Sequence, residues 1–548
     1  MIETDVCIVG AGPTGLTLAL ELATRGHRVT ILESRRGDQF SNPKASHISA
    51  RSMEIFRRLG MADDVRKQGL PDDFPNDGVY ATRYNGFEIA RFAMPSRRQR
   101  FDDEGYVDDN LPSRERAARV SQMFLAPVMA DHARRFPGIQ VLEGTCFESL
   151  DEDETGVTVS AVATERNEAL RVRCRYLVGA DGPASSVRKA LGVRLEGMDN
   201  LVQCRSIMFR APQLLHLSAY PTAWMHWFFV RGNWSSLIAI DGRELWLIHH
   251  FVPPGVNPES VNVDEATREV LGVGDDFSYD VVSREDWTGR RLIAEHFQRG
   301  RCFMVGDAIH QWVPYGGYGM NAGIADADNL GWKLDAVLKG WAPPELLDTY
   351  ELERRPVDVC MSEIIAELSR TLNDDVDPAL LEQDSAEGVA ARRAFGEKIF
   401  ADNIHSMVPT GFNFGYCYEN SAIVAADGEQ APPLTMGQYT ATTVPGCRLP
   451  HFWLADGRSL YDALPDGYTL LRFGGDIDVA PLEGAARAKG VPMSVLDVVP
   501  GRDFDTAVYR QRLILVRPDQ HIAWRGDRIP ANCDALIERI RGATSRLH

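Results

Sequence analysis

The sequence has no closely spaced pair of cysteines. Its nine cysteines are scattered singly, with no Cys-x-x-Cys pair and no Cys and His spacing typical of a zinc site or a disulfide framework. Scattered thiols are typical of proteins that stay in a reducing compartment. We therefore expect a reduced, cytoplasmic protein without a bound metal ion.

Positive charge and long apolar runs are also scarce. The 59 Lys and Arg residues are outnumbered by 77 Asp and Glu, which leaves a formal net charge of -18. This charge repels phosphates, so a nucleic-acid partner and a polybasic contact with anionic lipid are both disfavoured. No stretch is apolar over about 18 residues and the N-terminus lacks the basic start of a secretory signal, so we expect no membrane partner and no export.

What the sequence does contain is enough apolar material for several domains. With 548 residues and an apolar share of 44%, it has room for three or four folding units. Near the N-terminus, a buried strand at 5–9, a helical pattern at 14–23 closed by Gly26, and a second strand at 29–32 predict a βαβ unit.

Further along the chain, β-branched and aromatic residues predict a mainly antiparallel sheet between residues 201 and 284. Long helices are expected at 322–338 and 346–372, and a compact βαββα unit is expected after residue 431. The strands predicted after the βαβ unit are 157–162, then 202–209, 224–230, 236–240 and 245–251, and in the last unit 468–473, 494–499 and the hairpin 513–524.

The loop between the first strand and helix is the motif Gly-Ala-Gly-Pro-Thr-Gly at residues 10–15. Glycines here let the chain turn tightly, let the backbone approach a pyrophosphate, and let the helix pack on the strand with its N-terminus facing the phosphates. Glu33, which closes the second strand, is placed to accept hydrogen bonds from a ribose hydroxyl. The motif predicts a bound dinucleotide but does not distinguish FAD from NAD.

Two further motifs follow predicted strands. Residues 176–188 read Tyr-Leu-Val-Gly-Ala-Asp-Gly-Pro-Ala-Ser-Ser-Val-Arg, and residues 302–310 read Cys-Phe-Met-Val-Gly-Asp-Ala-Ile-His, with a glycine-rich loop at 314–321. In this order, the three motifs resemble the single-component flavoprotein aromatic hydroxylases, which include p-hydroxybenzoate, phenol and chlorophenol hydroxylases. The resemblance covers nearly the whole chain.

The resemblance implies bound FAD, with NADH or NADPH as reductant and O2 as co-substrate. It implies that Asp307 holds the ribityl chain and that the loop 314–321 lies against the flavin ring, where a helix N-terminus stabilises negative charge. Arg119 and Gln122 match positions that contact the FAD diphosphate and the flavin side chain, and Lys44 stands where many relatives have arginine. The expected cofactor-binding residues are Gly10, Gly12, Pro13, Thr14, Gly15, Glu33, Lys44, Arg119, Gln122, Asp181, Gly306, Asp307, Pro314, Gly317, Gly319, Met320 and Asn321.

The candidate catalytic residue is His47. The segment 43–56 resembles a stretch of the hydroxybiphenyl and chlorophenol hydroxylases in which a matching histidine lies near the substrate hydroxyl. A phenol has a pKa near 10, and histidine, which titrates near neutrality, is a suitable general base for it. The alternative is that His47 only hydrogen-bonds the loop backbone. Aromatic and imidazole side chains on the predicted sheet are candidates to contact a planar substrate, namely Trp224, His226 and Trp246, together with Trp227, His249 and His250.

The resemblance implies an α/β fold. A Rossmann-type FAD-binding domain is interwoven with a mainly antiparallel β-sheet substrate domain, and a thioredoxin-like C-terminal domain without Cys-x-x-Cys follows. The expected boundaries are 1–75, 105–200 and 285–371 for the FAD-binding domain, 76–104 and 201–284 for the substrate domain, 372–430 for a helical or loop connection, and 431–548 for the C-terminal domain.

The function that the resemblance implies is hydroxylation of a small phenolic or hydroxylated heteroaromatic substrate through a flavin C4a-hydroperoxide, with NAD(P)H and O2. The motifs leave open Baeyer–Villiger or epoxidising chemistry on the same fold, and a non-catalytic FAD-containing assembly protein. A flavin halogenase is disfavoured because the Trp-x-Trp-x-Ile-Pro signature is absent. The tail is expected to be structural or to form a homo-oligomer.

Overall fold

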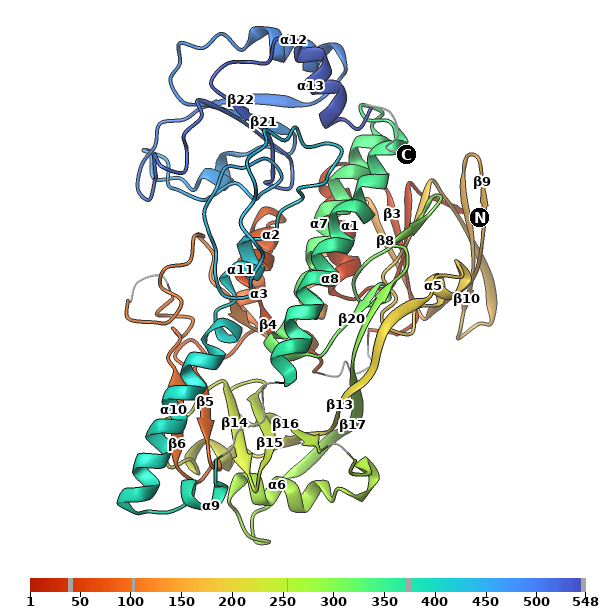
Figure 1. Cartoon of the computed structure of the whole chain (residues 1–548). Helices are drawn as coiled ribbons and strands as arrows, with labels where there is room; N and C mark the ends of the chain where they lie inside the picture. The colour runs from red at the N-terminus through yellow and green to blue at the C-terminus, as the bar shows by residue number, and fades with distance from the viewer. Residues whose placement is uncertain (38–42, 101–103, 254, 371–375, 544–548) are drawn as a thin grey trace.

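The computed structural model describes residues 1–37, 43–100, 104–253, 255–370 and 376–543. A sheet flanked by helices occupies the middle of the molecule, a second sheet lies below it, and a small C-terminal domain lies at the opposite end (Figure 1). No helix within these ranges is long and apolar enough to cross a bilayer.

The middle sheet contains the predicted βαβ unit, which is confirmed. Strands β2 (Val6–Val9) and β3 (Val29–Glu33) are buried along their whole length, as expected for parallel strands covered on both faces, and α1 (Pro13–Thr24) connects them. The sheet has the order β18-β19-β12-β2-β3-β8. Its other strands are β8 (Ile139–Glu143), β12 (Tyr176–Gly179), β18 (Gln298–Arg299) and β19 (Cys302–Met304).

Helix α7 (Gly319–Leu338) packs along α1 (Figure 1). Two glycines let these helices approach closely, because a Cβ at Gly331 would lie 2.8 Å from the Cβ of Glu21 and one at Gly323 would lie 2.4 Å from the hydroxyl of Thr14. The remaining helices of this part are α2 (Ala50–Arg58), α3 (Ala62–Lys67), α4 (Gln122–Ala133), α5 (Ser186–Ala190) and α8 (Thr349–Arg370).

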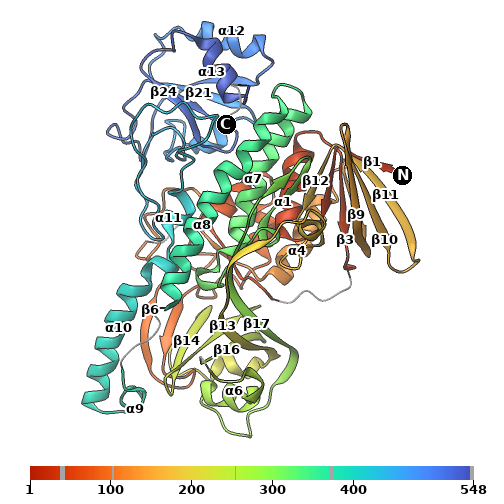
Figure 2. The same cartoon turned by 45° about the vertical axis from the view of Figure 1, so that its right-hand side comes forward.

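A four-stranded sheet, β1-β11-β10-β9, projects from the middle sheet at the right of Figure 2. A two-stranded ribbon pairs β4 (His47–Ile48) with β7 (Ala118–Arg119). The strands of the four-stranded sheet are β1 (Ile2–Glu3), β9 (Thr145–Asp153), β10 (Gly156–Ala163) and β11 (Glu168–Cys174).

The lower sheet has eight strands in the order β20-β17-β13-β16-β15-β14-β5-β6. The predicted antiparallel pairing is confirmed for β13 to β16, whereas β14 and β5 are parallel. The long strands β13 and β17 run from the middle of the molecule into this sheet (Figure 1). The strands are β5 (Gly78–Ala81), β6 (Glu88–Phe92), β13 (Leu195–Arg210), β14 (Met225–Val230), β15 (Asn233–Ala239), β16 (Leu245–Val252), β17 (Asp280–Ala294) and β20 (His310–Gln311), with α6 (Val263–Leu271) against them.

The connection to the C-terminal domain is largely helical. Helix α10 (Ala386–Met407) packs along β6, and two short helices, α9 (Pro378–Leu381) and α11 (Thr410–Phe414), precede and follow it. A Cβ at Gly396 would lie 2.1 Å from the carbonyl oxygen of Ile89, so glycine is needed where the helix crosses the strand. Residues 371–375, which include the last two positions of the helix predicted at 346–372, lie outside the described part of the chain.

The C-terminal domain has the thioredoxin-like sheet order β22-β21-β23-β24. Along the chain its elements run β-α-β-β-β-α, which is one strand more than the predicted βαββα arrangement. Both arms of the hairpin are separate strands, β23 beside β21 and β24 beside β23. The elements are β21 (Tyr468–Arg472), α12 (Ala480–Ala488), β22 (Met493–Asp497), β23 (Leu513–Val516), β24 (Ile522–Gly526) and α13 (Cys533–Ile540).

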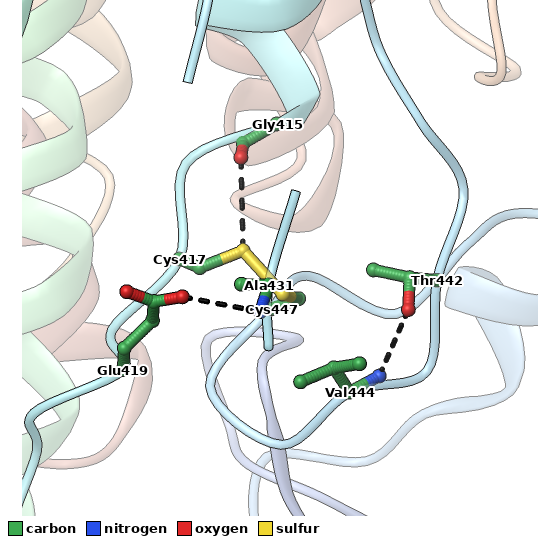
Figure 3. The surroundings of a disulfide bond; sticks show 7 residues. All are labelled: Gly415, Cys417, Glu419, Ala431, Thr442, Val444 and Cys447. Carbon is green, nitrogen blue, oxygen red and sulfur yellow. Dashed lines mark hydrogen bonds between the residues drawn. A yellow bond between two sulfur atoms is a disulfide. The ribbon is translucent and has the colours of Figure 1, made fainter. Parts of the chain in front are cut away.

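Figure 3 shows a disulfide between Cys417 and Cys447. The expectation of a chain without disulfides is therefore wrong for this pair, and the cysteines no longer support a cytoplasmic location. The two cysteines are 30 positions apart, but two irregular segments pair there in antiparallel fashion and bring the Cα atoms to 4.2 Å. The backbone N–H of Ala431 donates to Glu419 beside the bond at 3.2 Å.

Candidate functional site

A cavity of about 720 Å³ lies where the carboxyl ends of β2 and β12 and the N-terminus of α1 face the lower sheet. This is the edge of a parallel sheet at which ligands bind in open α/β folds. The expected site residues that line it are Gly10, Gly12, Pro13, Thr14, Glu33, Lys44, His47, Arg119, Gln122, Asp181, Trp224, Asp307, Pro314, Gly317, Gly319 and Met320. Five expected residues do not line it, namely Gly15, Gly306, Asn321, His226 and Trp246.

The glycine turn forms a cradle at one end of the cavity. Gly10 has a φ of +106°, and a Cβ on it would lie 2.3 Å from the carbonyl oxygen of Ala180, so only glycine fits. A Cβ on Gly12 would meet no atom within 4 Å and would instead fill the cradle. Gly12 is also the N-cap of α1 and no side chain caps the helix, so its first N–H groups are free to bind an anion. These features fit the diphosphate of FAD.

Two carboxylates border this cradle. Glu33 accepts hydrogen bonds from the backbone of Ala11 at 2.7 Å and of Arg35 at 2.9 Å, which fixes its side chain beside the turn. Asp181 accepts from Ser185 Oγ at 2.5 Å and from the backbone of Ser186 at 2.6 Å. Asp181 therefore shapes the start of α5 at the cavity edge, while Glu33 keeps lone pairs for a ribose hydroxyl.

The third motif presents Asp307 to the cavity. The Asp307 side chain is open to the cavity, but the surrounding protein atoms partly remove it from water. This desolvation raises the pKa of the carboxyl, although the charges of His310 and Lys44 act in the opposite direction. Gly306, with a φ of +63°, donates its backbone N–H to Asp326 at 3.0 Å. Gly306 thus supports the turn that aims Asp307.

His310, Asp326 and Asp358 lie close enough together to hold a metal ion. Arg354 already supplies the compensating charge, because its guanidinium donates to Asp326 at 2.7 Å and to Asp358 at 2.9 Å. His310 donates to Asp326 at 2.9 Å, and although burial opposes its charge, the two carboxylates raise its pKa to about 9. This group is a buried ion-pair network beneath the Asp307 turn.

His47 lies against the glycine-rich loop and opposite Arg119. A Cβ on Gly317 would lie 3.1 Å from the Cβ of His47, and Asn321 fixes both by donating to the carbonyl oxygens of His47 at 3.1 Å and of Gly317 at 2.8 Å. Arg119 Nη1 donates to His47 Nδ1, and the Arg119 guanidinium stacks 4.0 Å above the ring of Trp224. Arg119 thus contacts a residue next to the glycine-rich loop and a residue next to the lower sheet, while its predicted contact with the FAD diphosphate stays a prediction.

Burial and the neighbouring guanidinium lower the pKa of His47 well below its ordinary value of 6.5. Burial also lowers the pKa of Arg119, to about 10, which leaves it charged at neutral pH. No carboxylate of the described residues forms an ion pair with Arg119. The site therefore holds a neutral imidazole beside a buried cation.

Aromatic side chains of the lower sheet form a wall of the cavity, and Trp227 among them contacts Tyr315 of the loop 314–321, with ring centroids 6.3 Å apart. Trp227 stacks between Tyr80 and Phe251, with ring centroids 6.2 and 5.7 Å away. Trp287 meets Phe251 edge-on at 6.2 Å. Tyr80, Phe251 and Trp287 also line the cavity but were not among the expected contacts, because their register in the sheet is not visible in the local sequence. Tyr315 of the glycine-rich loop lines it as well.

His226 and Trp246 face the other side of the same sheet. His226 is fully buried and packs edge-on against Tyr84, with ring centroids 5.1 Å apart, and Trp246 donates to the carbonyl oxygen of Ala211 at 3.2 Å. Strand alternation explains the difference, because neighbours on a strand point to opposite faces. Of the expected substrate contacts on β14 and β16, Trp227 and His249 point to the face that lines the cavity.

The fold and the site together define a flavoprotein oxidoreductase with an FAD-binding domain and an aromatic-lined cavity. Residues 3–362 match the FAD binding domain family, and residues 442–544 match the C-terminal domain of aromatic-ring hydroxylases. The chain therefore belongs to the FAD-dependent aromatic-ring hydroxylases and is an FAD-dependent aromatic monooxygenase.

Individual relatives agree along the whole chain. The FAD-dependent monooxygenase apdD of Emericella nidulans is 32% identical over 98% of this chain and 90% of its own. Phenol 2-monooxygenase of Pseudomonas sp. is 30% identical over 99% and 93%. The solved structure of RebC with bound 7-carboxy-K252c has a TM-score of 0.88 at 33% identity, covering 99% of this chain and all of the other.

Proposed function

We propose that this enzyme hydroxylates a phenolic or hydroxylated heteroaromatic compound, using NAD(P)H and O2. The observation that carries the proposal is Arg119, a buried guanidinium at the cavity wall that contacts His47 and has no ion pair among the described residues. Asp108 attracts Arg119 but forms no ion pair with it, and a buried cation in that position is costly unless a bound anion lowers the cost. The phenolate form of a substrate supplies such an anion.

His47 acts in this proposal as a hydrogen-bond donor. Its Nδ1 accepts from Arg119, so the ring hydrogen of the neutral imidazole is on Nε2. The low pKa of His47 opposes the transfer of a proton to it, so a general-base role is disfavoured. His47 Nε2–H donates to the substrate oxygen, and Arg119 stabilises the negative charge on that oxygen. The site therefore favours the phenolate form of the substrate, whose ring is more electron-rich than that of the neutral phenol.

The aromatic wall positions the ring. Tyr80, Trp227 and Phe251 are packed against one another and line the cavity with aromatic surface of the kind that contacts planar substrates. The relative named phenol 2-monooxygenase supports a phenolic substrate, and the 7-carboxy-K252c complex of RebC supports a larger one. Bound FAD, once reduced by NAD(P)H, supplies the oxygen chemistry: one atom of O2 enters the ring and the other leaves as water.

The test is a screen of phenols, naphthols and larger hydroxylated aromatics for stimulated NAD(P)H oxidation, with isotopically labelled O2. One labelled oxygen on a new ring hydroxyl supports the proposal. Ring-expanded esters or epoxides from the same screen favour Baeyer–Villiger or epoxidising chemistry instead. Stimulated NAD(P)H oxidation with no labelled product, across the whole panel, contradicts hydroxylation of these substrates.

A further inference from the structure

A single row of residues crosses the cavity floor from strand to strand. Trp227 of β14 pairs with Ser236 of β15, Ser236 pairs with His249 of β16, and His249 pairs with Ser206 of β13. Residues paired in this way point to the same face of a sheet. Trp227, Ser236 and His249 all line the cavity, so the row is a polar line in an otherwise aromatic and apolar floor.

His249 differs from the other two histidines of β14 and β16. His250, its neighbour, points to the opposite face, and both its ring nitrogens have partners, Ser235 at 3.1 Å and Thr267 at 2.9 Å. His226 is enclosed in the apolar core of that face. His249 alone of the three lines the cavity, and only its Nδ1 is bonded, to Ser206 Oγ at 2.7 Å.

The partners of Ser206 determine which nitrogen of His249 carries the hydrogen. The indole N–H of Trp287 can only donate, and it donates to Ser206 Oγ at 3.1 Å. The hydroxyl hydrogen of Ser206 then has two possible acceptors, His249 Nδ1 at 2.7 Å and the thiol of Cys204 at 3.5 Å. The ring nitrogen is the closer and the stronger acceptor. His249 therefore accepts at Nδ1 and carries its hydrogen on Nε2.

Nothing within the described part of the chain accepts the Nε2–H of His249, and burial keeps this ring neutral by lowering its pKa to about 4. Beside it, the hydroxyl of Ser236 is buried and has no hydrogen-bond partner among the residues that the structure describes. An unsatisfied donor in an enclosed site favours a ligand that supplies the missing acceptor.

We infer that His249, supported by Ser206 and Trp287 and flanked by Ser236, is a polar subsite for an uncharged acceptor oxygen of the substrate, such as a ring carbonyl, remote from the oxygen held at His47. This inference rests on the proposed function, because it takes the bound molecule to be the hydroxylated aromatic. It narrows the substrate class to fused aromatics with a carbonyl or similar oxygen on a ring other than the phenolic one.

The experiment compares two ligands with one carbon skeleton. FAD-loaded enzyme is titrated with 2-hydroxyanthraquinone and with 2-anthrol, which lacks the ring carbonyls, and Kd is read from the flavin absorbance without NAD(P)H. We expect His249→Phe to weaken quinone binding about tenfold and anthrol binding less than about twofold, as for the loss of one hydrogen bond. His249→Gln, whose amide nitrogen can replace Nε2–H, restores most of the loss.

Ser206→Ala tests the positioning role of Ser206, since it removes the group that fixes the tautomer without touching the ligand. It should reduce the quinone preference while leaving FAD content unchanged. Equal weakening of both ligands in His249→Phe, or no weakening of either, overturns the inference and leaves the proposed function intact. Failure of wild-type enzyme to bind either ligand overturns the inference, whereas labelled hydroxylation of simple phenols in the same preparation still upholds the proposed function.

Discussion

His47 and Arg119 face each other across the two-stranded ribbon of β4 and β7, and the Arg119 guanidinium donates to the His47 imidazole. The pairing joins a histidine of the flavin side to a cation that stacks on Trp224 of the substrate side. Because the donor occupies Nδ1 and the charge opposes protonation, we propose that the pair stabilises an anion in the cavity instead of taking up a proton.

Removing the charge of Arg119 should change the pH dependence of turnover. An opposite charge within a few ångströms lowers the pKa of an acid by roughly one to three units, so Arg119→Met should raise the pKa of the bound phenol. The rise of the kcat profile, which reports groups in the enzyme–substrate complex, should then move to higher pH by at least about one unit. Arg119→Lys keeps the charge and should stay closer to wild type. Loss of FAD in both variants, with an unshifted profile for the enzyme that retains FAD, would instead place Arg119 on the FAD diphosphate.

Gly12 and Gly10 should respond differently to alanine. The methyl group of Gly12→Ala meets no protein atom but fills the cradle, and the φ of Gly12 is −72°, so the fold should persist while FAD affinity falls at least about tenfold. Gly10→Ala combines a φ of +106° with a close approach to Ala180, so it should destabilise the protein itself. FAD titration of the apoprotein and urea unfolding separate the two effects. Normal FAD affinity in Gly12→Ala would mean that the diphosphate lies elsewhere.

Local sequence patterns were sufficient for the parts of the fold that depend on near neighbours. The βαβ unit around α1 follows from three short apolar patterns and a glycine turn within 33 residues of the N-terminus. The contact of His47 with Arg119 joins residues 72 positions apart, and no local pattern reports it. The face of the lower sheet that meets the cavity depends on strand register, and a shift of one residue exchanges His226 for Trp227.

The Cys417–Cys447 disulfide should be measurable directly. Denatured but unreduced protein should show seven free thiols, and reduction should raise the number to nine. The bond closes a loop with a sequence separation of 30, so Cys417→Ala combined with Cys447→Ala should lower the free energy of unfolding by roughly 3 to 4 kcal/mol on the chain-entropy estimate. Nine thiols without reductant would show that the bond does not form in solution.

The C-terminal domain is held to α8 by a buried ion pair between Arg517 and Glu353. Both terminal nitrogens of the Arg517 guanidinium donate to the Glu353 carboxylate, at 2.7 and 2.8 Å, and Lys333 donates to the same carboxylate at 2.7 Å. Burial opposes the ionised form of Glu353, but Arg517 and Lys333 outweigh it and lower its pKa to about 2. Burial prevails at Lys333, whose pKa falls to about 8, so Arg517 supplies most of the compensation.

Glu353→Gln removes one of the two carboxylates that pair with the buried Arg517, the other being Asp519, and it leaves the buried Lys333 without its carboxylate partner. It should therefore lower the free energy of unfolding by about 3 to 5 kcal/mol at neutral pH. Because the folded pKa of about 2 lies below the ordinary value of 4.5, the stabilisation is complete above pH 4.5 and is lost as the pH falls towards 2. Urea unfolding should therefore show the wild type and the variant converging over that interval. The control is Glu363→Gln, on the same helix as Glu353. Glu363 is an exposed ion-pair partner of Arg291 on β17, so this change should lower the free energy of unfolding by less than about 1 kcal/mol. A pH-independent gap between wild type and Glu353→Gln would mean that packing, not charge, holds the domain in place.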